Sequence, residues 1–189
     1  MPPLNLVSPP DKKTSAMFDL GTSFIASVER DPEAPAIVDG DLRLSYRQWY
    51  ARISALVAAL DDAGLRVGDH LVTALQNRWE AATLHWACQL AGLVITPINW
   101  RSKAEEIDFY LENSGARAIV YQDITAAAVA QSQRAGALCR IALDAPADGV
   151  LAFAEMIAET ATEVLPRASA ESLSVMLYTS GTTSRPKGV

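Results

Sequence analysis

The hydrophobic and polar positions along the chain follow two periods, one typical of buried strands and one of helices. Short segments with almost no polar residues span 71–75, 94–96, 118–121 and 138–143. Strands that lack polar positions are covered on both faces. Between them, apolar residues three and four positions apart predict amphipathic helices. This alternation predicts an α/β fold in which a mostly parallel sheet carries helices on both faces.

Local signals predict where several helices begin and end. The first helix begins near Met17 and ends at Asp31, because Pro32 disfavours helical geometry at the residue before it. A polar residue followed three positions later by Gln or Glu can cap the first N–H groups of a helix. Three pairs have this spacing: Ser45 with Gln48, Asn77 with Glu80, and Ser102 with Glu105.

Two further regions complete the predicted elements. Strands at 36–38 and 42–44 flank Asp39-Gly40-Asp41, a turn that predicts an antiparallel hairpin. Near the C-terminus we expect a helix over 151–161 and then a last strand over 173–178, which leads into the final residues of the sequence.

Composition excludes several classes of protein. With 189 residues, of which 50% are hydrophobic, the chain can bury a substantial core, except for a proline-rich arm over 1–16 that we expect to be loose. A net charge of −6 gives no general attraction for nucleic acid. Cys88 and Cys139 have neither disulfide nor zinc-site spacing, so we expect reduced thiols in a cytoplasmic protein without a membrane span.

The last twelve residues carry the one segment that indicates chemistry. Hydroxyl side chains surround a glycine directly after the predicted strand, where α/β sheets usually bind ligands. Backbone N–H groups, hydroxyls and an ammonium group can together hold a phosphate. The candidate phosphate-binding residues are Thr179, Ser180, Gly181, Thr182, Thr183, Ser184 and Lys187. The alternative, for a Ser/Thr/Gly-rich terminus, is a flexible tail.

The order of these residues differs from a Walker A loop, because Pro186 and Gly188 flank Lys187. It closely resembles the phosphate-binding signature of the adenylate-forming superfamily, Tyr/Phe-Thr-Ser-Gly-Thr-Thr-Gly-x-Pro-Lys-Gly-Val. Only Ser184 differs, since the family most often has glycine there. Weaker similarity extends upstream through residues 44–48, 64–77, 91–99 and 113–117. The resemblance implies that residues 17–189 form the N-terminal part of the large AMP-binding domain, incomplete at its C-terminus.

The resemblance implies the chemistry of an AMP-forming acyl-CoA synthetase. Such enzymes bind ATP, magnesium and a carboxylic acid, form an acyl-adenylate with release of pyrophosphate, and transfer the acyl group to coenzyme A. In the family, the glutamate that binds magnesium, the residue that binds ribose, most of the acyl pocket and the catalytic lysine follow the phosphate loop. We therefore expect residues 1–189 alone to be inactive, with no catalytic residue assigned within them.

Alternatives to this function stay open. The chain could be a truncated, non-catalytic binding module, or it could pair with the remainder of the enzyme as a separate chain. It could also belong to an adenylation domain that loads a carrier-protein thiol. Fatty acyl, aromatic, alicyclic and carnitine-like acids all remain candidate substrates.

Isolated reactive side chains indicate structural roles. His70 and His85 have no second potential metal ligand or catalytic partner near them in the sequence, so we expect both to be packing residues. Arg101 could anchor a loop by pairing with a carboxylate.

Overall fold

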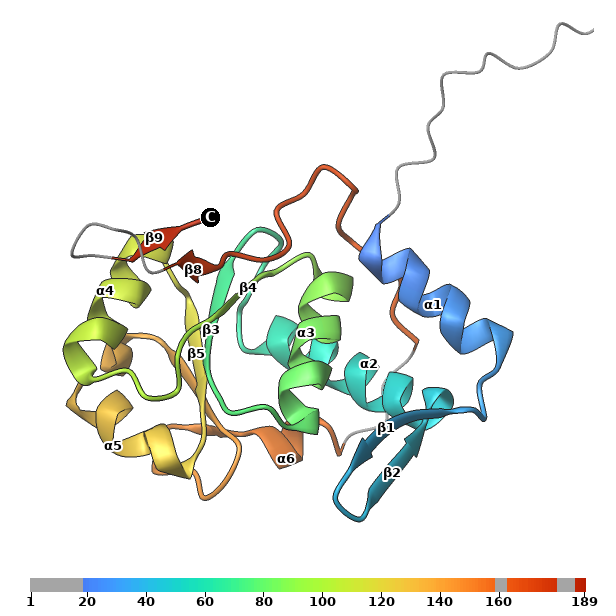
Figure 1. Ribbon diagram of the computed structural model, residues 1–189, viewed down its shortest axis with the longest axis horizontal. Coiled ribbons are helices and arrows are strands. Elements are labelled where there is room, and N and C mark those ends of the chain that lie inside the picture. The colour runs from blue at the N-terminus through green and yellow to red at the C-terminus, as the bar shows by residue number, and fades with distance from the viewer. Residues whose placement is uncertain (1–18, 159–162, 180–185) are drawn as a thin grey trace, which may run out of the picture.

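The computed structural model describes residues 19–158, 163–179 and 186–189 (Figure 1). The predicted arm over 1–16 lies outside them. The central sheet has five parallel strands in the order β4-β3-β5-β6-β7. These strands are β3 (His70–Ala74), β4 (Val94–Pro97), β5 (Ala118–Tyr121), β6 (Cys139–Ala142) and β7 (Leu151–Ala152). The predicted parallel α/β architecture is confirmed.

Helices cover both faces of this sheet (Figure 1). On one face lie α2 (Tyr46–Asp62) and α3 (Trp79–Ala91), and on the other lie α4 (Ala104–Ser114) and α5 (Asp123–Gln131), followed by the 3-10 turn η1 (Ala135–Ala137). Each face has its own cluster of buried side chains. From β3 the chain passes through α3 to β4, on one side of β3. It then passes through α4 to β5, on the other side of β3. The strand order therefore reverses between β3 and β5.

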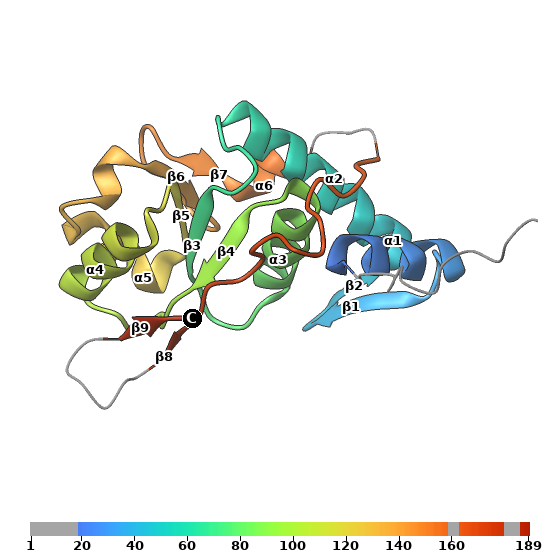
Figure 2. The same cartoon turned by 90° about the horizontal axis from the view of Figure 1, so that it is seen from above.

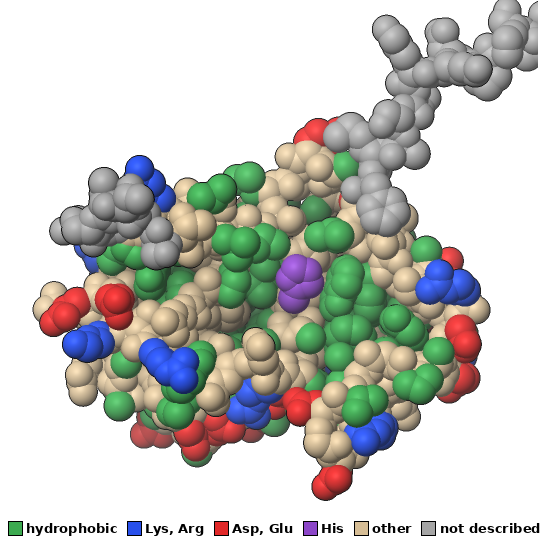
Figure 3. Space-filling model, in the orientation of Figure 1, with side chains coloured by type: hydrophobic (Ala, Val, Ile, Leu, Met, Phe, Trp, Pro, Cys, Tyr) green, Lys and Arg blue, Asp and Glu red, His purple; other side chains and the backbone are tan. Residues whose placement is uncertain are grey.

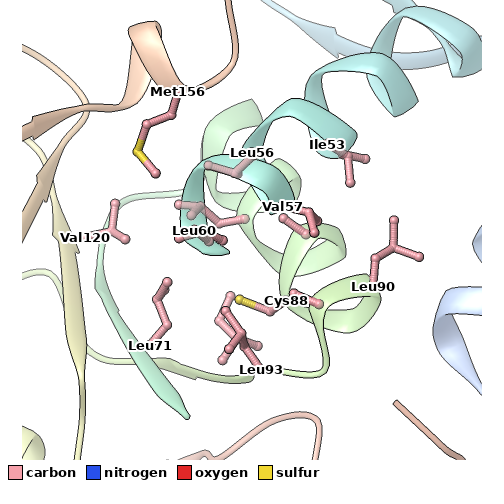
Figure 4. Close-up of a cluster of buried hydrophobic side chains, with 14 of the residues drawn as sticks. Ile53, Leu56, Val57, Leu60, Leu71, Cys88, Leu90, Leu93, Val120 and Met156 are labelled. Atoms are coloured by element: carbon pink, nitrogen blue, oxygen red, sulfur yellow. The ribbon is translucent and has the colours of Figure 1, made fainter. Parts of the chain in front are cut away.

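The larger core lies between the sheet and helices α2 and α3 (Figure 4). Ile53, Leu56 and Val57 of α2 are completely buried, as is Leu71 of β3. Burying a side chain of this size stabilises a fold by roughly 1.5–3 kcal/mol. The apolar stripe of α2 and the apolar strands therefore account for the way these layers pack.

A small N-terminal unit packs beside α3 (Figure 2). It consists of α1 (Leu20–Arg30) and the antiparallel hairpin of β1 (Pro35–Asp39) and β2 (Leu42–Ser45), which confirms the predicted hairpin. The ring of Phe24 stacks on Trp86 with 4.7 Å between centroids and meets the edge of Trp49 at 5.4 Å. These aromatic contacts attach α1 to both α2 and α3.

The predicted caps differ in outcome. The Ser45–Gln48 box is present, with both reciprocal hydrogen bonds. The Asn77–Glu80 box is wrong, because α3 starts one residue later and its first N–H, on Trp79, donates to the Asp39 carboxylate of the hairpin at 2.9 Å. The Ser102–Glu105 box is displaced by one residue. In α4 it is Glu106 that accepts the backbone N–H of Lys103, at 2.8 Å.

The region after β6 also departs from expectation. Residues 151–152 form strand β7 and only Phe153–Met156 form a helix, α6, so the predicted helix over 151–161 is wrong at its start; residues 159–162 lie outside the described part. The predicted strand over 173–178 is not continuous: Val175 forms a single parallel bridge to Ile95, and Tyr178 begins a separate two-residue strand. Leu173 is 74% exposed, which shows that this stretch lacks the cover that a buried strand has.

Between α6 and that bridge, residues 163–169 pass beside α1, α2 and α3. The Tyr50 hydroxyl donates to the carbonyl of Val164 at 2.9 Å, and Arg167 pairs with Asp61 at 2.7 Å. Gly21 leaves room for this segment, since a Cβ there would lie 2.9 Å from Pro166. None of the helices in the described ranges is long and apolar enough to cross a membrane.

Candidate phosphate-binding site

The predicted phosphate-binding segment is joined to a short antiparallel hairpin. Strand β8 (Tyr178–Thr179) pairs with β9 (Lys187–Gly188), and the two N–H···O bonds between Leu177 and Val189 measure 2.9 and 2.8 Å. Thr179 stands opposite Lys187 in the register. The structure thus brings together the two predicted site residues that it describes. Ser180, Gly181, Thr182, Thr183 and Ser184 lie outside the described residues.

The hairpin lies at one end of the central sheet (Figures 1 and 2). The backbone around Val175 runs parallel to β4: the Ile95 N–H donates to the Ser174 carbonyl at 3.1 Å, and the Met176 N–H donates to the Ile95 carbonyl at 3.0 Å. Tyr178 then follows beyond the carboxyl end of this parallel pairing. In α/β sheets that is the usual side for ligands.

The hairpin presents a hydroxyl and an ammonium group to solvent. Thr179 and Lys187 are both exposed, and none of the ion pairs found within the described ranges involves Lys187. An ammonium group without a carboxylate partner can bind an anion without first breaking an ion pair. The two side chains therefore suit contact with phosphate oxygens.

Helix α4 packs against the hairpin through Tyr178. The Tyr178 hydroxyl donates to the side-chain oxygen of Asn113 at 2.8 Å. The Tyr178 ring lies 4.6 Å from that of Tyr110 and 6.1 Å from that of Phe109, centroid to centroid. Burial raises the pKa of Tyr178, so the phenol stays protonated and able to donate at neutral pH.

Gly188 packs closely under the first strand of the hairpin. A Cβ at this position would overlap the methyl group of Met176 and would approach the Tyr178 ring to 3.4 Å. A side chain here would therefore displace Met176 or separate the two strands. This contact gives a physical reason for glycine at this position.

A second polar group, which the sequence analysis missed, lies where the strand order reverses. Gln76 follows β3 and Gln122 follows β5. The Gln122 side-chain amide donates a 3.0 Å hydrogen bond to the side-chain oxygen of Gln76, and the backbone N–H of Gln76 donates to the side-chain oxygen of Gln122 at 2.8 Å. Arg78 makes two bonds to Glu80, at 2.7 and 2.8 Å, and lies 3.6 Å from Asp144. The glutamine pair and the charged group both lie beyond the carboxyl ends of the parallel strands. Their position directly after predicted strands was the available signal.

Within the described ranges, the histidines and Cys88 make packing contacts or single hydrogen bonds. Burial lowers the pKa of both His70, which lies 3.2 Å from the Thr96 hydroxyl, and His85, which packs edge-on against Trp86. Burial raises the pKa of the Cys88 thiol to about 12. Over the described ranges there is no cluster of three His, Cys, Asp or Glu that could hold a metal ion.

Arg101 was expected to pair with a carboxylate, and that expectation is wrong. Its guanidinium lies 3.9 Å above the ring centroid of Trp100, and it takes part in none of the ion pairs formed by the described residues. The aromatic ring provides the contact that the carboxylate was expected to make.

Comparison with known proteins agrees with this geometry. The sequence profile of a family described as AMP-binding enzyme matches residues 24–189, which is most of the chain. The chain belongs to the AMP-binding enzyme family. The profile match includes the hairpin and the predicted phosphate-binding segment, and the resemblance noted from the sequence is confirmed at the level of the family.

Several curated relatives in this family are acyl-CoA synthetases or ligases by name. A feruloyl-CoA synthase from Amycolatopsis sp is 31% identical over 169 residues, which cover 89% of this chain and 32% of that protein. The long-chain-fatty-acid–CoA ligase FadD13 of Mycobacterium tuberculosis is 30% identical over 159 residues, 79% of this chain and 29% of that protein. The chain thus spans about a third of the length of the curated relatives it matches.

A solved structure confirms the fold. The N-terminal domain of FACL13 from Mycobacterium tuberculosis superimposes with a TM-score of 0.79 at 26% identity, covering 90% of this chain and 43% of that one. The chain therefore has the architecture of the N-terminal part of an adenylate-forming enzyme.

Proposed function

We propose that the full-length protein containing this chain is an ATP-dependent carboxylate–CoA ligase that releases AMP and pyrophosphate. The observation that carries the proposal is the pairing of Thr179 with Lys187 at the carboxyl side of the sheet, within the region that the family profile matches. The similarity to a feruloyl-CoA synthase and to FadD13 supports coenzyme A as the acceptor. The free thiols Cys88 and Cys139 suit a reducing compartment such as the cytoplasm.

The reaction has two steps. An oxygen of the substrate carboxylate attacks the α-phosphorus of ATP, the bond to the bridging oxygen breaks, and pyrophosphate leaves with that oxygen. The sulfur of coenzyme A then attacks the acyl carbonyl carbon and displaces AMP. Negative charge accumulates on the leaving pyrophosphate in the first step, and that is where cationic and hydroxyl groups lower the barrier.

Within this mechanism the chain's own residues bind and orient the β- and γ-phosphates. The Lys187 ammonium offsets charge on the leaving group, and the Thr179 hydroxyl donates to a phosphate oxygen. Ser180, Gly181, Thr182, Thr183 and Ser184 complete the proposed phosphate-binding segment. The described residues contain no group of three His, Cys, Asp or Glu side chains that could hold magnesium.

We further propose that residues 1–189 alone do not form acyl-adenylate, since they cover only about a third of the relatives' length. Carboxylate-dependent exchange of labelled pyrophosphate into ATP tests both statements. We expect exchange with the full-length protein and none with residues 1–189. A panel of fatty, aromatic and alicyclic acids defines the substrate, and coenzyme A tested beside a carrier protein defines the acceptor. Failure of the full-length protein with every acid would refute the ligase assignment.

A further inference from the structure

A side-chain hydrogen bond between Tyr178 and Asn113 ties the hairpin to helix α4. It is 2.8 Å long and spans 65 positions of sequence. Beside it, the rings of Tyr178 and Tyr110 lie 4.6 Å apart, with 58° between their planes. We call Tyr110, Asn113 and Tyr178 the α4 anchor.

The hairpin is otherwise held by its own backbone bonds and by those of Ile95 to Ser174 and Met176, just before it. Leu177 is 52% exposed, Val189 is 79% exposed, and the strands β8 and β9 are two residues long. Two-stranded hairpins are marginally stable by themselves in water. Packing against α4 is therefore a large share of what holds Thr179 and Lys187 in place.

Helix α4 is well suited to be the fixed partner. Tyr110 is 7% exposed and belongs to the buried cluster between α4, α5 and the sheet. The helix ends in a left-handed Gly115, and the hydroxyl of Ser114 donates to the Tyr110 carbonyl at 2.7 Å. Asn113 thus projects from a turn whose backbone is fixed on both sides.

We propose that Asn113 is a positioning residue for ATP use: through Tyr178 it fixes the strand that leads into the phosphate-binding segment. The inference rests on the proposed function. It assigns a role to α4, which carries none of the predicted phosphate-binding residues. Because an exposed neutral hydrogen bond contributes modestly, the expected effect of losing it is small but specific.

Hydrogen exchange and kinetics on the full-length protein test this role. In Asn113→Ala and Tyr178→Phe we expect the Leu177 and Val189 amides to exchange several-fold faster. KM for ATP should rise about two- to fivefold, while KM for the carboxylic acid stays unchanged. Asn113→Asp keeps the acceptor oxygen and should behave as wild type. The double variant should be no worse than either single variant, since both remove the same bond.

Arg134→Ala is the matched control. It removes the 2.6 Å ion pair between Arg134 and Glu112, a residue of α4, but leaves the contacts of Tyr178 in place. The exchange rates and KM for ATP should therefore stay unchanged. Unchanged exchange in Asn113→Ala, or faster exchange with an unchanged KM for ATP, overturns the proposal. If the wild-type protein shows no pyrophosphate exchange, the proposed function and the role in ATP use both fail. The amide exchange rates still decide whether the anchor holds the hairpin.

Discussion

The indole N–H of Trp49 donates a 2.8 Å hydrogen bond to the hydroxyl of Thr83, joining α2 to α3 inside the core. Thr83 is completely buried, Trp49 is 6% exposed, and the same hydroxyl donates to the Trp79 carbonyl at 2.9 Å. One side chain therefore satisfies a buried donor on one helix and also bonds the backbone of its own helix.

Replacing Thr83 by Val should destabilise the fold by about 1–3 kcal/mol, because the shape is kept while the Trp49 N–H loses its buried acceptor. Urea denaturation followed by tryptophan fluorescence measures the free energy of unfolding. Thr83→Ser retains the hydroxyl and serves as the control. A Val variant as stable as the wild-type protein would show that this bond contributes nothing.

Gly92 and Gly115 end α3 and α4 in the same left-handed geometry, with φ of 73° and 65°, but their surroundings differ. A Cβ at Gly92 would lie 3.1 Å from a methyl group of Val67, whereas nothing lies within 4 Å at Gly115. Gly115→Ala should cost about 1 kcal/mol from backbone strain, and Gly92→Ala should cost more. Gly136→Ala, with no left-handed φ and open space, is the control; equal losses at 92 and 115 would contradict the steric argument.

Two partly buried histidines predict that stability falls on mild acidification. Burial lowers the pKa values of His70 and His85, so below about pH 6.5 the unfolded chain binds more protons than the folded one. Stability is then greatest above that pH and decreases as the pH falls from 7.5 to 5.5. The unfolding midpoint should change less with pH across this range in His85→Gln than in the wild-type protein. The lowered pKa values of Asp19 and Asp108 act at lower pH and leave this window clear. A His85→Gln variant whose unfolding midpoint depends on pH as steeply as that of the wild type would contradict this prediction.

Lys187→Ala in the full-length protein should lower kcat/KM for ATP about 10- to 100-fold, the effect expected from losing a charge-assisted hydrogen bond to phosphate. Lys187→Arg keeps the positive charge and should retain more activity. Because Lys187 is exposed, the free energy of unfolding should not change in either variant. Steady-state rates at varied ATP check the prediction, and an Ala variant with wild-type kcat/KM would contradict the phosphate contact.

The distribution of charged and apolar side chains in the structure follows their pattern in the sequence. In the view of Figure 3 most charged side chains lie toward the edges of the molecule, while hydrophobic side chains are prominent in the middle of the face. The apolar periodicity that predicted α2 and the parallel strands is the same property that fills the core in Figure 4. For α2 and the parallel strands, burial of the apolar side chains was therefore predictable from spacing alone, whereas the apolar segment at 173–178 is largely exposed at Leu173 and Leu177.

Local hydrogen bonds were predictable only where no distant group competed. Ser45 and Gln48 form the expected capping box because both partners lie within one turn. At α3 the same type of pair fails, because Glu80 is engaged by Arg78 and the Trp79 N–H binds Asp39, 40 positions away. Asn77 is left exposed as a result.

By itself, the sequence determined the alternation of strands and helices, the hairpin at residues 35–45 and the phosphate-binding signature at the C-terminal end. These depend on side-chain periodicity, turn residues and short-range order. Only the tertiary structure decided that Gln76 binds Gln122 and that Tyr178 binds Asn113, pairs separated by 46 and 65 positions. Such contacts depend on the strand order and on which helix covers each face, and no local pattern encodes that arrangement.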